Sequence, residues 1–180
     1  MSKAPTHLAD ITKRDESLST EDKFVADLVC TCGNSDFELQ HAACNLEELG
    51  APQTAEIDGN FFFVIKAQCK VCRKDHLVFD ADYHGWDGFV CYREYGNRKH
   101  LRPPMVSWTC PECKGNCHSL KLDISMDRET ILDDGPVDDD DGNIILNEEN
   151  YQDGFDWITM SITCSSCGHH HDSWVGYETM

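Results

Sequence analysis

The chain has 180 residues, of which 15 are basic and 33 acidic, and its formal net charge is −18. Only 40% of the residues are hydrophobic, and no run of about 18 apolar residues occurs, which excludes a membrane-spanning helix. The sequence opens without the apolar core of a secretory signal peptide, so we expect a cytoplasmic protein. A charge this negative repels nucleic acid phosphates unless a local basic patch escapes the average.

Two elements are expected before the first cysteine. Residues 1–17 are polar and predict a flexible tail. Beyond this tail, Ser19 could cap the N-terminus of a short helix through its side-chain oxygen. Alternatively, residues 24–29 already form the first strand and lead directly into Cys30.

Eleven cysteines are unusual for a chain without an export signal, and in a reducing compartment they indicate metal thiolates rather than disulfides. Two residues between a pair of cysteines allow one turn to present both sulfurs to one ion, and a closed structural zinc site needs two such turns. Four turns therefore predict two four-cysteine sites, although the first turn is one residue shorter than usual. The predicted ligands are Cys30 with Cys32, Cys69 with Cys72, Cys110 with Cys113, and Cys164 with Cys167.

An internal repeat indicates which turns belong together. In the first half, residues 37–39 follow the first turn and residues 61–67 run into the second. In the second half, residues 120–126 and 157–163 hold the same places, and both alternate apolar and polar residues as half-buried strands do. Each half therefore has the order turn, strand, long connection, strand, turn, strand. This order assigns the first two turns to one metal site and the last two turns to another.

The repeated order, with glycine-bearing turns at Cys113-Lys114-Gly115-Asn116 and Cys167-Gly168, resembles the zinc-ribbon (rubredoxin-like) superfamily, present twice in tandem. The resemblance implies a mainly β fold of two small antiparallel sheets with long acidic connections, each sheet pinned by structural metal. The first ribbon-like domain is expected at residues 18–102 and the second at residues 103–180. The resemblance also implies two Zn²⁺ ions, with iron as the less favoured metal because rubredoxin uses similar turns.

The spare thiols and two histidines are candidate substitute ligands in case a turn fails to bind. His76 and His171 each follow the last cysteine of their half by four residues, and Cys117 lies close behind the third turn. Cys117 is also the spare thiol best placed for redox chemistry. Cys44, an alternative ligand for the first site, and Cys91 are expected to be ordinary buried residues.

A loop from His84 to Phe89 is the least generic peptide of the first half. Two glycines bracket Trp86 and Asp87, so the chain is expected to turn sharply there. One interpretation makes His84, Trp86 and Asp87 a recognition loop with aromatic anchors. We favour the alternative, in which the aromatic side chains cover a small core. The histidine run at residues 169–171 is likewise expected to have no role, because side chains alternate in direction along a strand.

The negative charge is distributed unevenly. Residues 1–65 carry 12 acidic and 4 basic side chains, residues 66–102 carry 5 and 8, and residues 103–180 carry 16 and 3. The corresponding balances are −8, +3 and −13, so a basic middle separates two acidic ends.

The basic middle ends in a segment, residues 93–102, that contains Arg98, Lys99 and Arg102 next to aromatic residues. Basic and aromatic side chains together can neutralise and stack on nucleic acid. We favour a solvated linker between the two domains, because both flanks are strongly acidic.

Residues 133–156 form an acidic insertion in the second half. Like charges at this density repel one another and favour a mobile, solvated connection. Part of the insertion also matches a calcium-binding loop, in which Asp139, Asp141 and Glu148 fall at ligand positions. Val137 stands at the first position of that loop and cannot ligate through its side chain, so we favour the mobile connection.

Sequence signatures of catalysis are missing, including the phosphate-binding glycine loop, the nucleophile elbow and the zinc-protease motif. Four thiols per ion also close the coordination position that a catalytic zinc keeps open. We therefore expect a zinc-binding, non-enzymatic protein that acts by protein–protein interaction through acidic surfaces. The alternatives are a nucleic-acid-associated zinc ribbon that uses residues 93–102, and a redox or metal-dependent enzyme that uses a spare cysteine or histidine.

Overall fold

The computed structural model describes the larger part of the chain, namely residues 2–43, 51–91, 103–129, 137–138, 142 and 144–179. Several sequence predictions lie outside these residues: those for Cys44, Arg98, Lys99, Arg102 and the calcium-loop residues Asp139 and Asp141.

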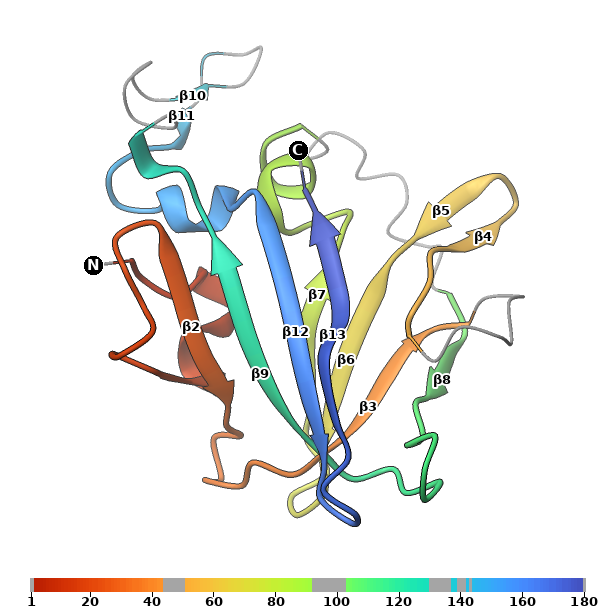
Figure 1. Cartoon of the computed structure of the whole chain (residues 1–180). Helices are drawn as coiled ribbons and strands as arrows, with labels where there is room; N and C mark the ends of the chain where they lie inside the picture. Colours follow the sequence, from red (N-terminus) through yellow and green to blue (C-terminus); the bar gives the residue numbers. More distant parts are fainter. Residues whose placement is uncertain are drawn as a thin grey trace.

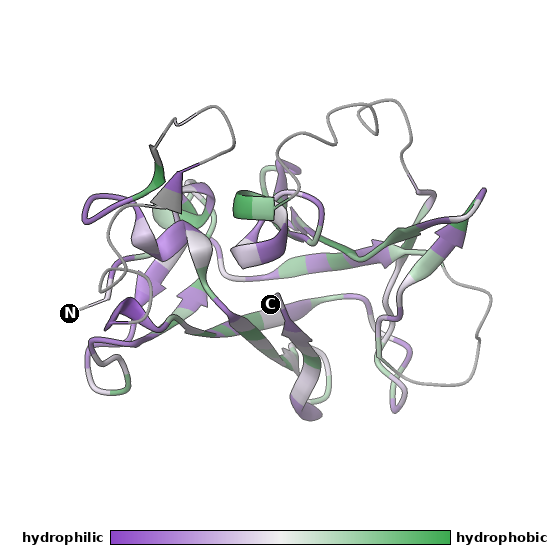
Figure 2. Ribbon diagram, turned by 90° about the horizontal axis from the view of Figure 1, so that it is seen from above, coloured by the Kyte–Doolittle hydropathy of each residue, from purple (hydrophilic) through white to green (hydrophobic). Residues whose placement is uncertain are grey.

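The described strands form a curled antiparallel sheet of nine strands and two separate hairpins. Curling gives the sheet two layers, seen one above the other in Figure 2. The front layer of Figure 1 contains β1 (Thr12–Arg14), β2 (Lys23–Leu28), β9 (His118–Ser125), β12 (Trp157–Cys164) and β13 (His170–Glu178). The back layer contains β8 (Met105–Ser107), β3 (Phe37–Ala42), β6 (Val64–Cys69) and β7 (Asp75–Asp80). The hairpins are β4 (Ala55–Ile57) with β5 (Asn60–Phe62), and β10 (Val137–Asp138) with β11 (Ile144–Leu146).

Each layer combines strands from both halves of the chain. In the front layer, β2 of the first half pairs with β9 of the second half. In the back layer, β8 of the second half pairs with β3 of the first half. The layers join where Phe37 of β3 pairs with His118 of β9. The mainly β, antiparallel fold class is confirmed, and the domain boundary expected at residues 102 and 103 stays a prediction.

Alternating apolar residues build the core between the two layers. Strands β9 and β12 bury every second side chain, as the period of a half-buried strand requires. One continuous cluster takes side chains from both halves, including Phe37 and Phe79 from the first and Ile124, Phe155 and Trp174 from the second. Burying a side chain of this kind stabilises a fold by about 1.5–3 kcal/mol. The main core therefore belongs to both halves together.

The N-terminal segment packs against this core instead of forming the expected flexible tail. The 3-10 helix η1 (Thr6–Ile11) buries Leu8 and Ile11, and β1 continues the chain into the sheet. Leu8 and Ile11 are three residues apart, which places both on one face of a 3-10 helix. Further upstream, the Ser2 hydroxyl donates a hydrogen bond to the Lys23 carbonyl at 2.8 Å. The two buried apolar residues, the pairing of β1 with β2 and the Ser2 hydrogen bond together hold this polar segment against the core.

The segment before the first cysteine is the strand β2, as the second of the two alternatives predicts. Ser19 does not begin a helix. Its hydroxyl accepts a hydrogen bond from the Val25 N–H at 3.0 Å and so closes the turn that leads into β2. The Ser19 hydroxyl therefore stabilises a turn before a strand and not the N-terminus of a helix.

The acidic insertion is partly ordered. The hairpin of β10 and β11 is followed by the 3-10 helix η4 (Tyr151–Gly154). Leu146, Tyr151 and Phe155 are buried, and they anchor this end of the insertion to the core. A further helix, η2, is a short π-helix at Trp86–Cys91. None of the helices in the described part of the chain has the length and apolarity needed to cross a membrane.

Candidate metal centres

The four cysteine turns gather at one end of the molecule, the lower end in Figure 1. There the eight thiols form two groups, each with its sulfur atoms within 4.8 Å of one another. The first group holds Cys30, Cys32, Cys69 and Cys72, and the second holds Cys110, Cys113, Cys164 and Cys167. The pairing of turns expected from the sequence is therefore the arrangement in the structure.

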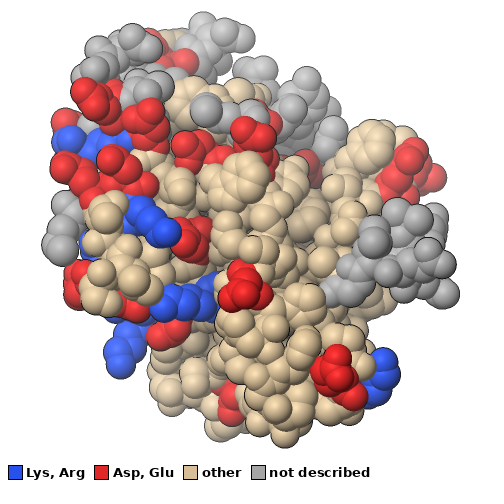
Figure 3. All heavy atoms as spheres, in the orientation of Figure 1, with Lys and Arg blue, Asp and Glu red and all other residues tan. Residues whose placement is uncertain are grey.

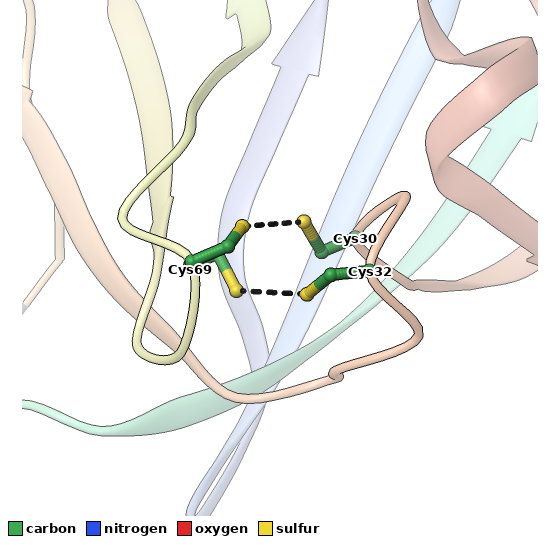
Figure 4. Close-up of side chains that lie close together, drawn as sticks. Cys30, Cys32 and Cys69 are labelled. Carbon is green, nitrogen blue, oxygen red and sulfur yellow. Dashed lines mark hydrogen bonds between the residues drawn. The ribbon is translucent and has the colours of Figure 1, made fainter.

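The sulfur separations fit a tetrahedral metal site. In the first centre, the Sγ atoms of Cys30 and Cys72 are 3.4 Å apart. Those of Cys32 and Cys69 are 3.6 Å apart (Figure 4). In the second centre, the two corresponding distances are 3.7 and 3.6 Å. A zinc–sulfur bond of about 2.3 Å in a tetrahedron requires sulfur atoms about 3.8 Å apart, whereas a disulfide requires about 2.05 Å. The donor set and its spacing therefore suit Zn²⁺.

All four turns share the same backbone hydrogen bonds. The N–H of the first cysteine donates to the carbonyl two residues beyond the second cysteine, at 2.8–2.9 Å. The residue directly after the second cysteine donates its N–H back to the carbonyl of the first cysteine, at 2.7–3.0 Å. That same residue has a positive φ in every turn: Gly33 (86°), Arg73 (61°), Lys114 (60°) and Gly168 (77°). The short first turn is therefore built like the other three.

Each turn supplies one buried and one exposed thiol. The first cysteine ends a strand or its extension and is buried, as Cys69 and Cys110 are at 0% exposure. The second cysteine lies in the turn and is exposed, as for Cys72 and Cys113. An ion held by four such thiols lies at the boundary between core and solvent, where it fastens two turns to each other.

Backbone N–H groups already favour a thiolate in the first centre. Burial opposes ionisation of Cys69, but hydrogen bonds from the N–H groups of Cys72 and Val71 outweigh it and lower the pKa of Cys69 to about 6. The N–H of Lys74 favours the Cys72 thiolate, but hydrogen bonding with Cys30 and burial oppose it more and raise the pKa of Cys72 to about 12. One thiol is thus ready to lose its proton, while its neighbour keeps one.

The second centre repeats this contrast. Burial opposes ionisation of Cys164, and hydrogen bonds from the N–H groups of Ser166 and Cys167 nevertheless lower the pKa of Cys164 to about 7. The N–H of His169 favours the Cys167 thiolate, but hydrogen bonding with Cys113 raises the pKa of Cys167 to about 12. Four thiolates at these distances repel one another, and a divalent cation supplies the charge that lets all four ionise.

Hydrogen-bonding groups surround the first centre at close range. The ring Nε2 of His76 lies 3.3 Å from Cys30 Sγ, and the side-chain amide of Asn34 donates to Cys69 Sγ at 3.4 Å. His76 therefore contacts a ligand sulfur from outside the four-sulfur group. Such second contacts hold a ligand in its orientation.

Two side chains connect one centre to the other, and the sequence analysis does not identify them. Ser165, which follows the first cysteine of the last turn, donates its hydroxyl to Asp36 Oδ1 at 2.6 Å. Lys70 holds the equivalent place in the first centre, and its Nζ donates to Asn116 Oδ1 and Glu38 Oε2, both at 3.2 Å. Ser165 and Lys70 hold the same position in the internal repeat, and this shared position is the sequence feature that could have identified them.

The remaining candidate ligands lie outside both groups. Cys117 is half-buried, and burial raises the pKa of its thiol. Cys91, at the end of η2, is exposed and not buried as expected from the sequence, because it lies at the surface end of this short helix. Partial desolvation nevertheless raises the pKa of its thiol. His171 packs its ring edge-on against Trp108, with centroids 5.9 Å apart, and His170 hydrogen-bonds to Thr163 at 2.8 Å. No metal-binding group includes these side chains among the described residues.

The candidate recognition loop packs against the rest of the chain. His84 stacks on His7 with ring centroids 3.6 Å apart, and the Trp86 N–H donates to the Phe155 carbonyl at 2.9 Å. Trp86 and Phe89 pack against the main core, which is the covering role that we favour from the sequence. Asp87 lines a hollow at the surface.

Comparison of the chain with protein-family models, with curated proteins and with solved structures finds no match, so its two four-cysteine centres have to be interpreted from their own geometry.

Proposed function

We propose that the protein binds two Zn²⁺ ions as structural staples and acts, without catalysis, by binding a partner protein through an acidic surface. The observation that carries the metal assignment is the pair of closed four-thiol groups, each with sulfur separations suited to a tetrahedral ion. When bound, zinc supplies a fourfold cross-link between two turns. Four thiols fill the coordination sphere, so no position is left for a substrate.

The spare thiols argue against the redox alternative. A reactive cysteine needs its thiolate at neutral pH, which a lowered pKa provides. Partial desolvation instead raises the pKa values of Cys91 and Cys117, the two spare thiols within the described residues. The nucleic-acid alternative depends on residues 93–102, which lie outside the described residues.

An acidic end opposite the metal centres supports a protein-binding role. Acidic side chains gather at the upper left of Figure 3, near the beginning of β2, the end of β9 and the β10–β11 hairpin. Arg128 lies among them, 2.8 Å from Glu148 and 3.7 Å from Glu21. We define the acidic end by its exposed members Glu21, Asp22, Asp127, Glu129, Asp138, Glu148 and Glu149. Clustered charge of one sign attracts and orients a partner of the opposite sign.

Metal analysis of the purified protein tests the first part of the proposal. We expect two zinc ions per chain and colourless protein. A red protein containing iron, or a single ion per chain, would contradict the assignment.

Charge neutralisation tests the second part. A variant that carries Glu21→Gln, Asp22→Asn, Glu148→Gln and Glu149→Gln loses four charges from the acidic end. The control variant loses four charges elsewhere, at the exposed residues Asp10, Asp27, Asp58 and Asp75, each changed to Asn. In quantitative co-purification, basic proteins should bind the unmodified chain and the control in a salt-dependent manner and should be lost from the first variant. Equal capture by both variants would refute a role for the acidic end.

A further inference from the structure

The histidine run at residues 169–171 leads from the last cysteine turn into β13, at the lower end of the molecule in Figure 1. Side chains alternate in direction along an extended chain, so His169 and His171 lie on one face and His170 on the other. Both His169 and His171 are half-buried, whereas His170 is exposed. The alternation that separates neighbouring histidines thus places the first and the third together.

The separation of the His169 and His171 rings fits a shared metal ion. Their centroids are 5.4 Å apart, and the ring planes are inclined at 81°. A ring nitrogen lies about 1.1 Å from the centroid of its imidazole and about 2.0–2.1 Å from a bound zinc ion, so two imidazoles on one tetrahedral ion have centroids about 5.2 Å apart. The observed separation matches this value.

The surrounding structure holds both histidines in place. The ring of His171 packs edge-on against the buried ring of Trp108, with centroids 5.9 Å apart. The backbone carbonyl of His169 accepts a hydrogen bond from the Cys164 N–H at 2.9 Å, as part of the last cysteine turn. Little conformational freedom is therefore lost when the two rings bind a ligand together, which favours binding.

The middle histidine has other contacts, on the opposite face. The Nδ1 atom of His170 lies 2.8 Å from Thr163 Oγ1, and its Nε2 atom lies 3.0 Å from Asp172 Oδ1. His170 is therefore an internal comparison, because the same residue type occurs in the same peptide with its ring held by different partners.

Electrostatic attraction also favours a cation beside His169. Cys167, a ligand of the second metal centre, precedes His169 by two residues. A Zn²⁺ ion bound to four thiolates has a net charge of −2, so the loaded centre attracts further cations instead of repelling them. The whole chain adds to this attraction with its formal charge of −18.

We propose that His169 and His171 form a third metal site, which binds a borderline divalent cation such as Zn²⁺ or Ni²⁺ through two imidazole nitrogens. Imidazole is a ligand that suits these cations. Among the described residues, the groups of three or more ligand atoms are the two four-thiol centres. The third site therefore has two protein ligands, and water or a group from another molecule completes its coordination. It is weaker than the four-thiol centres and, unlike them, open.

The probe is Zn²⁺ itself, added to the full-length protein after dialysis has left the two structural ions in place. Isothermal titration calorimetry measures the binding of a further ion. His169→Gln removes one ligand, and His171→Phe removes the other while keeping an aromatic ring against Trp108. His170→Gln is the matched control, because it changes the histidine on the opposite face.

The unmodified protein should bind one further Zn²⁺ ion. His169→Gln and His171→Phe should each weaken this binding by at least about tenfold, since each removes one of two protein ligands, and His170→Gln should change it by less than about twofold. In nuclear magnetic resonance spectra, the imidazole signals of His169 and His171 should shift together as Zn²⁺ is added, while those of His170 stay in place. Circular dichroism and a content of two retained zinc ions show that each variant remains folded.

Several results would overturn the third site. They are the absence of a further ion, an affinity that His169→Gln or His171→Phe leaves unchanged, and an equal loss of affinity in His170→Gln. None of these results bears on the proposed function, because the two retained ions and the binding of a partner through the acidic end are measured separately.

Discussion

One turn of the first metal centre is one residue shorter than the turns of the second, but it has the same backbone hydrogen bonds. A single residue, Thr31, separates Cys30 from Cys32, whereas two residues separate the cysteines of the other three turns. Even so, the Gly33 N–H reaches the Cys30 carbonyl at 2.7 Å, and the Cys30 N–H reaches the Asn34 carbonyl at 2.8 Å. What defines these turns is the pair of backbone hydrogen bonds and the left-handed residue after the second thiol, because the residue count between the thiols can change without breaking either.

The two halves also pair their strands in equivalent registers. Phe37 lies opposite Cys69 in the first half, and His118 lies opposite Cys164 in the second, in each case five residues beyond the preceding turn. The strand that precedes the first turn of each half pairs with a strand of the other half: β2 pairs with β9, and β8 pairs with β3. Each half therefore completes the sheet of its partner, which neither half could do alone.

Among the changes considered, metal removal should have the largest effect on the stability of the two halves. Because the halves share one core, a strong chelator should abolish the fold of both in a single transition, with a loss of about 10–16 kcal/mol of apparent binding free energy per ion. Circular dichroism and thermal melting with and without chelator measure this. Two separate transitions would show that the halves are independent, and an unchanged melting curve would show that metal is not structural.

Loss of one ligand tests whether the centres depend on each other. Cys32→Ser and Cys113→Ser each remove one exposed ligand, and each variant should retain one zinc ion. The retained ion should bind about tenfold more weakly than in the unmodified protein, because hydrogen bonds such as that from Ser165 to Asp36 connect the centres. Competition with a chromophoric chelator measures the affinity.

The matched control for this coupling is Ser165→Ala. This variant breaks the bridge but removes no ligand, so it should retain two zinc ions. Combined with Cys32→Ser or Cys113→Ser, it should reduce the loss of zinc affinity at the intact centre. An affinity of the intact centre that is unchanged in both cysteine variants would mean that the two centres load independently.

Acid should destabilise the contact between η1 and β7, where the His7 ring hydrogen-bonds to the Val78 carbonyl. Burial lowers the pKa of His7 from 6.5 to about 4, so the unfolded chain binds a proton that the folded chain does not. Stability therefore falls as the pH drops below about 6.5, by about 2 kcal/mol at pH 5 for this one group. Denaturant unfolding at pH 7 and pH 5 should show this extra loss in the unmodified protein and not in His7→Phe.

The control for that experiment is His170→Gln, a change at an exposed histidine of β13. It should leave the difference in stability between the two pH values as it is in the unmodified protein. If His7→Phe loses as much stability on acidification as the unmodified chain, the stacked pair of His7 and His84 does not titrate as described.

The smallest expected effect concerns the left-handed residue of each turn. Gly33→Ala and Gly168→Ala should each lower the free energy of unfolding by about 1–2 kcal/mol, since a Cβ disfavours positive φ. Arg73→Gly and Lys114→Gly make the reverse change and should be neutral or stabilise by up to about 1 kcal/mol. Denaturant unfolding of the zinc-loaded variants measures all four. Equal behaviour of glycine and non-glycine turns would contradict a common construction.

Local patterns accounted for much of the site. The spacing of the cysteines identified the eight thiols of the four turns, because a chelating turn is a short-range feature of the chain. The internal repeat then divided these turns into two groups. The alternation in residues 120–126 and 157–163 likewise predicted the core strands β9 and β12. The flexible tail expected at residues 1–17 shows the limit of composition, because only packing reveals that Leu8 and Ile11 have a core to enter.

Other features depend on contacts between distant segments. The bridge from Lys70 to Asn116 joins side chains 46 residues apart. The repeat marks the position of Lys70, but it does not identify the partner of Lys70. The hollow between Thr54 and β13 also depends on distant segments, because Thr54 belongs to the first half of the chain and β13 to the second.

The sequence by itself determined the composition of the metal centres and the antiparallel, mainly β class, because both follow from short-range spacing and from the two-residue period of a strand. The tertiary structure decided that the two halves share one sheet and one core, with β2 and β8 exchanged between them. Backbone N–H and carbonyl groups are the same in every strand, so backbone hydrogen bonding alone does not specify which strands pair. The packing of whole layers therefore decides which strands pair, and here it joined the two halves of the chain.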